Sequence, residues 1–177
     1  GNHDLYFRCG GFSPGGWREN ARKGGNQDGS VHDWKNAGCY PYPRDHTIDI
    51  TLNDKGDKTT VTKNFYNYHN VDLPGSGVPS TFYSEFGVLP KSGNSATTLM
   101  QIMEDSSSVE RHFVAGYLNA KLFANVNPRN FGFYISPALG VSMYREYALN
   151  GYSYYQTTAG NKLYPDDIRN FFNRTYH

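Results

Sequence analysis

The sequence predicts an α+β fold, in which a β-hairpin and several helices surround one core of aromatic side chains. Apolar and polar residues alternate over residues 46–64, which is the pattern of half-buried strands. Residues 97–124 and 137–177 instead carry apolar residues at helical spacing. The chain has 15 Tyr, 11 Phe and 2 Trp among its 177 residues, and its mean hydropathy is -0.69. Aromatic rings must therefore supply much of the buried apolar area.

Residues 1–45 contain most of the glycine- and proline-rich segments, including CGGFSPGG and RKGGNQDGS, so we expect this part to be rich in loops. It holds both cysteines, Cys9 and Cys39, which form no CxxC pair and have no histidine at zinc-ligand spacing. They are either free thiols or one disulfide. Because the chain is rich in Tyr, Gly, Asn and Thr, as suits a secreted protein, we expect a disulfide. It would tie the segment together and contribute about 3–4 kcal/mol.

The hairpin is expected within residues 46–64. Ile48, Ile50 and Leu52 alternate with polar residues, NDKGDK has the composition of a turn, and TTVTK forms the returning strand. Residues 65–96 follow as an aromatic, loop-rich stretch. Because we find no internal repeat and no clean boundary, residues 1–177 are expected to form a single domain.

The helical segments carry recognisable start signals. The run SSSVERHFVAGYLNAKLFA opens with serines and places Glu110 in the first turn, and its apolar stripes predict the central helix of the core. Pro137 and Pro165 each stand where a helix accepts proline, at its first position. They predict two further helices, with the short aromatic strand GYSYYQTT between them.

The segment FSPGGWREN places a proline and two glycines directly before a tryptophan. Pro14 fixes one φ angle, and Gly15 and Gly16 accept conformations that are closed to other residues. We therefore expect a sharp turn that pushes Trp17 into the core, in preference to a loop that binds a ligand.

The central helix supplies the other expected core anchors. Trp17 is expected to pack on it near Phe113 and Tyr117. His112 and Asn119 are seven residues apart, so they share a face of this helix. They either frame a polar pocket or make structural hydrogen bonds, His112 to a loop carbonyl and Asn119 to the backbone. We favour the structural role, because buried polar side chains are usually satisfied in this way.

Many tyrosines fall in loops or short strands, and they are too many for one core of this size. Exposed tyrosines anchor protein–protein interfaces or form platforms on which sugar rings stack. A surface with scattered aromatic residues of no consequence is the third possibility. The interface or glycan-binding candidates that we select are Tyr66, Tyr68, Tyr152, Tyr154 and Tyr155.

Charge and motifs argue against several classes of function. The net charge is +1 and the basic residues are scattered, so no nucleic-acid partner is expected. No apolar run is long enough to span a bilayer. The chain has no G-x-S-x-G elbow, HExxH motif, P-loop or dinucleotide fingerprint, so we predict neither an enzyme nor a cofactor.

Two short signals lie near the ends of the sequence. If Gly1 is a free N-terminus, its amine, two amides and the imidazole of His3 match the donor set of a square-planar Cu(II) or Ni(II) site. A histidine at the third position is common by chance, so no metal site is predicted. Asn173-Arg174-Thr175 matches an N-glycosylation sequon, which matters only in a suitable host.

Two motifs together resemble a family of secreted bacterial modules found in surface and matrix proteins, most of them without an assigned activity. FSPGGWREN is similar to the family's SPGYWKNH motif, and RHFVAGYLNA is similar to its RHAVAALLNA motif. The intervening FYSEFGV and TTLMQIM resemble its phenylalanine-glycine and TLLQVL segments, so the resemblance covers about residues 9–125. The family's tyrosine is Gly16 here and its last histidine is Asn20, so no role of that histidine carries over.

This resemblance implies an extracellular location and an architectural role more often than an enzymatic one. With the aromatic excess, it leads us to expect a secreted, non-enzymatic structural protein, a subunit of a surface filament or matrix assembly built by self-association. Its partners would be further copies of the chain or other components of an extracellular matrix. The alternative is a carbohydrate-binding module of an adhesin or exoenzyme, with glycans as ligands.

Overall fold

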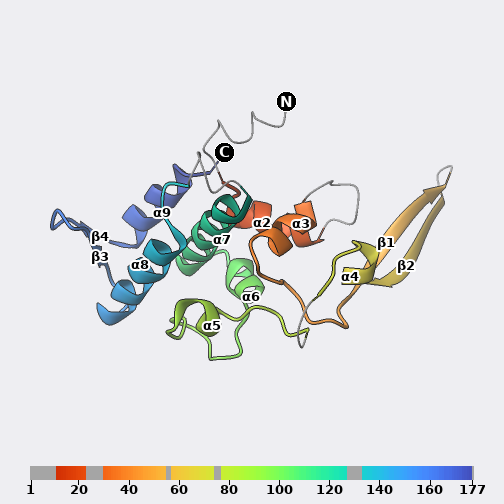
Figure 1. Ribbon diagram of the computed structural model, residues 1–177, viewed down its shortest axis with the longest axis horizontal. Helices are drawn as coiled ribbons and strands as arrows, with labels where there is room; N and C mark the ends of the chain where they lie inside the picture. Colours follow the sequence, from red (N-terminus) through yellow and green to blue (C-terminus); the bar gives the residue numbers. More distant parts are fainter. Residues whose placement is uncertain (1–10, 23–29, 55–56, 74–76, 127–132, 177) are drawn as a thin grey trace.

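The computed structural model describes residues 11–22, 30–54, 57–73, 77–126 and 133–176. The fold is α+β, because helices are combined with two small two-stranded sheets. Figure 1 shows an elongated molecule in which the helices gather on one side and a β-hairpin extends from the opposite end.

The helix α7, Glu110–Val126, is the centre of the helical body. It is buried from His112 to Ala120, and Glu110 at its start is buried as well. The helices that pack against α7 are α2 (Pro14–Arg22), α3 (Ser30–Asn36), α6 (Leu99–Glu104), α8 (Pro137–Leu149) and α9 (Pro165–Asn173). These six helices are the helical body, and Figure 1 shows α7 in its middle. A shorter helix, α5 (Phe82–Phe86), packs against α8.

The hairpin joins β1, Thr47–Asp54, to β2, Asp57–Asn64, in an antiparallel pair. The alternation of residues 46–64 predicted this pair. Ile50 lies opposite Val61, and Ile48 lies opposite Lys63. A second pair joins β3 (Tyr155–Gln156) to β4 (Lys162–Leu163) next to α8.

The hairpin is attached to the body at its base by the short helix α4, Phe65–Tyr68, which follows β2 directly. The Phe65 amide donates to the His46 carbonyl oxygen over 2.7 Å. Phe65 is fully buried, and its ring meets that of Tyr42 edge to face at 5.1 Å. The base of the hairpin is therefore fixed, while Figure 1 shows its far end projecting away from the body.

The core is built from aromatic rings, as the composition predicts. Phe113 on α7 is fully buried, and its ring centroid lies 5.2–5.5 Å from those of Tyr144, Tyr147 and Phe172. These rings come from α8 and α9 and meet edge to face or tilted, which is the favoured geometry of aromatic pairs. Within the described residues, no helix is long and apolar enough to cross a membrane.

The segment before residue 45 is more regular than its glycine content predicts, because it contains α2 and α3. Ser13 caps α2: its hydroxyl accepts from the Gly16 amide over 3.1 Å, and its carbonyl accepts from the Trp17 amide. Pro14 is the first helical residue. Serine followed by proline is thus a helix start here, and the expected sharp turn through Gly15 and Gly16 is wrong.

The expected disulfide between Cys9 and Cys39 is also corrected. Cys39 carries a buried free thiol, and Cys9 lies outside the described residues. The thiol donates to the Glu85 carboxylate over 3.4 Å, so its polar partner comes from α5 and not from a second cysteine. In the structure, packing against α7 organises this part of the chain in place of a disulfide.

Candidate functional site

Asn119 is the polar centre that joins α7 to the FSPGGW segment. Its Oδ1 accepts from the Phe12 amide over 2.9 Å and from Trp17 Nε1 over 3.0 Å. Its Nδ2 donates to the Phe12 carbonyl over 2.9 Å. Because Asn119 and Trp17 are fully buried, these bonds satisfy groups that water does not reach. The expected backbone bond of Asn119 is present, and the two motifs of the family resemblance meet at this residue.

The same junction also receives the C-terminal part of the chain. The Gly11 amide donates to the Thr175 carbonyl over 2.7 Å, and a side chain at Gly11 would overlap Asn119. His112 Nδ1 lies 3.0 Å from the Tyr176 hydroxyl, so its partner is a hydroxyl and not the loop carbonyl that we expected. Burial, and then the positive charges of Arg111 and Arg169, lower the pKa of His112 to about 4. His112 is therefore neutral at pH 7.

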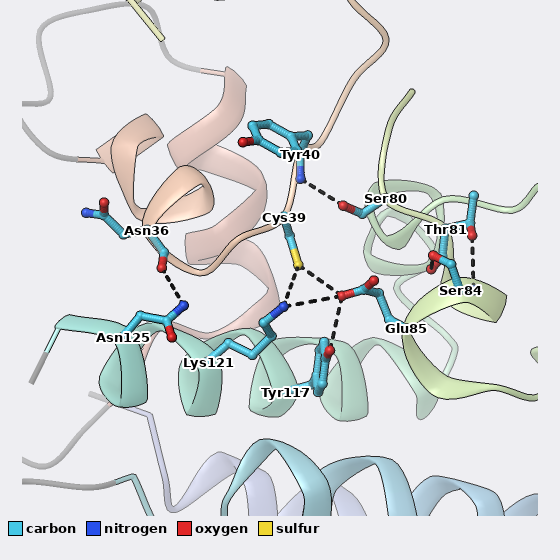
Figure 2. Close-up of polar contacts among 10 residues, drawn as sticks. All are labelled: Asn36, Cys39, Tyr40, Ser80, Thr81, Ser84, Glu85, Tyr117, Lys121 and Asn125. Carbon is cyan, nitrogen blue, oxygen red and sulfur yellow. Dashed lines mark hydrogen bonds and ion pairs between the residues drawn. The ribbon is translucent and has the colours of Figure 1, made fainter. Parts of the chain in front are cut away.

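A second polar cluster, which is partly buried, surrounds Cys39 and is drawn in Figure 2. Glu85 Oε1 is shared by three groups: the Cys39 thiol at 3.4 Å, the Tyr117 hydroxyl at 3.0 Å and Lys121 Nζ at 3.5 Å. Lys121 Nζ also lies 4.0 Å from Cys39 Sγ. The cluster joins the segment after α3, the helix α5 and the helix α7, which are far apart in the sequence.

The electrostatics of this cluster favour a structural role. Burial, and then the negative charge of Glu85, raises the pKa of the Cys39 thiol to about 12. Burial raises the pKa of the Tyr117 hydroxyl in the same way. Both groups therefore keep their protons at neutral pH, and a protonated thiol is a poor nucleophile. The cluster holds three chain segments together by hydrogen bonds to one carboxylate.

Glu110 is a further buried acid with structural partners. Its Oε2 accepts from the Lys91 amide over 2.7 Å and from the Tyr144 hydroxyl. Within the part of the chain that the structure describes, no group of three or more His, Cys, Asp or Glu side chains is arranged to hold a metal ion. Gly1, Asn2 and His3, the possible Cu(II) or Ni(II) donors, lie outside that part.

Two of the five selected tyrosines direct their hydroxyls to backbone carbonyls. Tyr66 is buried, its hydroxyl donates to the Tyr42 carbonyl, and burial raises its pKa to about 12. The hydroxyl of Tyr152 donates to the Leu89 carbonyl over 3.2 Å, while its ring lies 6.0 Å from that of Tyr147. Tyr66 is a core residue, and Tyr152 is half-buried at the edge of the core.

The other three selected tyrosines are half-buried at two distant places. Tyr68 ends α4 at the base of the hairpin, whereas Tyr154 and Tyr155 lie at β3, beyond α8. The ring of Tyr154 lies 6.0 Å from that of the exposed Tyr164, and Lys162 Nζ lies 4.6 Å from the Tyr154 ring centroid. The five tyrosines therefore do not form one surface.

An open groove of about 700 Å³ runs along α8. Its wall includes Tyr117 on α7 together with Ala138, Val141, Arg145, Glu146 and Leu149 on α8. Leu149, at the C-terminal end of α8, is 86% exposed. No local sequence signal marks this groove, because its lining depends on how α8 packs on α7.

Asn173, the acceptor of the sequon, is exposed at the end of α9. Thr175 is buried, and its hydroxyl donates to the Phe172 carbonyl over 2.6 Å. Comparison with protein-family models, with curated proteins and with solved structures found no match for the chain. The family resemblance therefore stays a prediction that rests on the two motifs.

Proposed function

We propose that this chain is a non-enzymatic structural subunit of an extracellular filament or matrix assembly, built by self-association. The observation that carries the proposal is the hairpin. Within the described part of the chain its strands form a two-stranded sheet, and Figure 1 shows this sheet projecting from the body. A two-stranded hairpin alone is marginally stable in water, and a third strand or a packed helix stabilises it. A neighbouring molecule is the natural source of that support.

The polar residues inside the helical body are consistent with this proposal. Hydrogen bonds that tie chain segments to one another are made by the buried residues Cys39, Glu110, His112 and Asn119 and by the half-buried Glu85. The extracellular location rests on the composition and on the family resemblance. Because Cys39 carries a free thiol, a disulfide does not support the extracellular location.

The test is the state of association of the purified chain. Light scattering over a concentration series, with negative-stain electron microscopy of the same samples, should show particles that grow with concentration and form regular filaments. A single species of 20.0 kDa at the highest concentration reached would overturn the proposal. Samples should be prepared with and without a reductant, so that association through thiols is recognised.

Carbohydrate binding is a second candidate function, favoured by the cluster of Tyr154, Tyr164 and Lys162. Tyr164 is 51% exposed, and the two rings with a nearby ammonium offer a face on which a sugar ring can stack. Glycan-array binding that is lost in Tyr154→Ala and retained in Tyr134→Ala would favour this candidate. Tyr134 is the matched control, because it is 56% exposed and lies outside the cluster.

A further inference from the structure

The outer edge of β2 is open to a further strand. Among the described residues, β2 pairs with β1 alone. The Phe65 amide donates to the His46 carbonyl oxygen, and these two residues continue the register of the hairpin by one row. In an antiparallel pair, the backbone groups of alternate residues point to the paired strand. Counted back from Phe65, those of Thr60 and Thr62 therefore point away from β1. An edge of this kind is a template for another strand.

β2 carries opposite charges towards its two ends, on the face that also holds Val61. At the tip of the hairpin, the register places Asp57 opposite Asp54, and like charges directly opposite each other destabilise a sheet. At the base, the exposed Lys63 lies opposite Ile48. The hairpin alone therefore pairs two acids at one end and leaves Lys63 without an acid opposite it at the other.

A second β2 strand in antiparallel orientation places these charges opposite each other. When the two strands are centred on Thr60, Lys63 of each copy lies opposite Asp57 of the other copy. Thr59 then lies opposite Val61, which is a favourable pair of β-branched residues. The backbone groups that point away from β1 meet one another in this register, because Thr60 is one of the residues that carry them. The apolar faces of both hairpins lie on the same side of the joined sheet.

Other arrangements of the edges lack these ion pairs. A shift of two residues removes both Lys63–Asp57 pairs, and a shift of one residue turns the apolar face of one copy away from that of the other. β1 contains Asp49 and Asp54 and no basic residue, so two β1 edges bring no opposite charges together. Stacking β1 on the β2 strand of the next copy in the register of the hairpin repeats the Asp54–Asp57 contact. The charges therefore select the β2 strand of a second copy.

We infer that the β2 strands of two copies pair edge to edge, antiparallel about Thr60, and form a four-stranded sheet. Figure 1 shows the hairpin projecting from the body, so the two bodies lie at opposite ends of the joined sheet. Four strands with one apolar face are more stable than an isolated pair of strands. The contact uses the same surface on both copies and closes on a pair, so a filament needs a second contact elsewhere. The inference rests on the proposed function, because it names one contact through which the subunits associate.

The first experiment exchanges charges between two variants. Lys63→Glu alone and Asp57→Lys alone should each raise the dissociation constant of the pair about tenfold or more, because like charges then face each other twice. In an equimolar mixture, both junctions of a mixed pair join an acid to a base. The mixture should therefore form pairs of twice the 20.0 kDa mass in analytical ultracentrifugation, with a dissociation constant within about threefold of the wild-type value.

The matched control for the charges is Lys91→Glu. Lys91 is exposed on a loop outside the hairpin, so its reversal should leave the dissociation constant unchanged. Recovery in the mixture also shows that the two hairpin variants are folded, because a misfolded chain would not regain the contact. Thermal melts of all variants check the helical body.

The second experiment removes a backbone donor from the edge. Thr60→Pro deletes the amide at the centre of the contact, and because this amide points away from β1 the hairpin keeps its own ladder. We expect the dissociation constant of the pair to rise about tenfold or more, since each copy loses a hydrogen bond and proline hinders the approach of the strands. Thr60→Val keeps the amide and suits a strand, so it should change the constant by less than about threefold.

Packing of the hairpins through their apolar faces is the competing contact, and Val61→Thr separates the two. In edge pairing, the new threonine lies opposite Thr59, which is a favourable pair, and the dissociation constant should stay within about twofold of the wild-type value. A rise of about threefold or more would place the contact on the face and overturn the inference.

The outcomes also separate this inference from the proposed function. If the wild-type chain stays at 20.0 kDa at every concentration, both fail together. If filaments form and the mixture of charge variants does not recover pairing, the inference is overturned and the proposed function stands. If pairs form as expected and nothing longer appears, the inference stands and the filament is ruled out.

Discussion

In the helical body, α7 has other helices around it, namely α2, α3, α6, α8 and α9, whereas each strand of the hairpin pairs on one side only among the described residues. The two regions also differ in the burial of their polar groups. Asn119 on α7 is fully buried and makes three hydrogen bonds, while Asp49 on β1 is exposed and accepts from the Thr62 hydroxyl over 2.8 Å. Substitutions in the body should therefore act on folding, and substitutions in the outer hairpin should act on association.

Trp17→Ala should produce the largest effect in the body. Trp17 is fully buried, and its ring meets those of Phe12 and Trp34 edge to face at 5.4 and 5.5 Å. The change leaves a cavity and removes one donor from Asn119, so we expect a loss of about 3–5 kcal/mol in the free energy of unfolding. Urea unfolding followed by circular dichroism measures it.

The control for this change is Tyr83→Ala, because Tyr83 is 46% exposed on α5. Its truncation should alter the unfolding free energy by less than about 0.5 kcal/mol. Equal losses in the two variants would mean that Trp17 is not the anchor of the body.

His112→Gln should change how stability depends on pH. The unfolded histidine has a pKa of about 6.5, and burial lowers the folded value to about 4. Between these values the unfolded chain binds more protons, so the contribution of His112 to stability falls as the pH falls from 6.5 to 4. The stability of the wild type relative to the variant should therefore rise by about 3 kcal/mol from pH 4 to pH 7.

The comparison with the variant is needed because Asp33 acts in the opposite direction. Burial raises the pKa of the Asp33 carboxyl from its ordinary value of 3.8 to about 7, so its contribution to stability is lost as the pH rises through this range. Asp33 is present in both proteins, and its effect cancels in the difference. Unfolding curves measured at several pH values give this difference, and parallel pH profiles would contradict the assigned environment of His112.

Two helix glycines provide a closer comparison within the body. A methyl group at Gly116 on α7 would overlap the ring of Phe172 on α9, so Gly116→Ala should cost about 1–3 kcal/mol. A methyl group at Gly140 on α8 would approach the flexible end of Ile135 at 3.3 Å and lie in ordinary van der Waals contact with Tyr117 at 3.9 Å. Alanine favours the helix by about 1 kcal/mol over glycine, so Gly140→Ala should be close to neutral. Thermal melts of the two variants measure this difference in stability. Equal destabilisation would show that Gly116 is not in close contact with Phe172.

The two regions also differ in how far the sequence alone predicts them. The hairpin and α7 follow from local periodicity, and Pro137 and Pro165 stand at helix starts as expected. For α2 the two glycines suggested a turn, but Ser13 and Pro14 begin a helix there. The low helix propensity of Gly15 and Gly16 is offset by the burial of Trp17. Local residue preference was outweighed there by tertiary packing.

The polar contacts were predicted in type but not in partner. The backbone bond of Asn119 was expected, but its partner Phe12 is 107 residues away along the chain. Cys39 meets Glu85 across 46 residues, and neither position carries a signal for the other. Such contacts depend on the arrangement of the helices, which periodicity does not determine. The α8 groove was missed for the same reason.

Val61→Thr should produce the smallest effect on stability. It tests most directly whether the hairpin, unlike the helical body, acts on association and not on folding. Val61 is half-buried in β2, and its cross-strand neighbour is Ile50. Threonine is also β-branched and suits a strand, so the unfolding free energy should change by less than about 0.5 kcal/mol. If the hairpin face docks on a second copy, the added hydroxyl is buried there without a partner, and the critical concentration for assembly should rise about threefold or more. The opposite result would be a loss of stability as large as that of Gly116→Ala, with assembly unchanged. The hairpin would then belong to the cooperative core, and its exposed position would have no bearing on association.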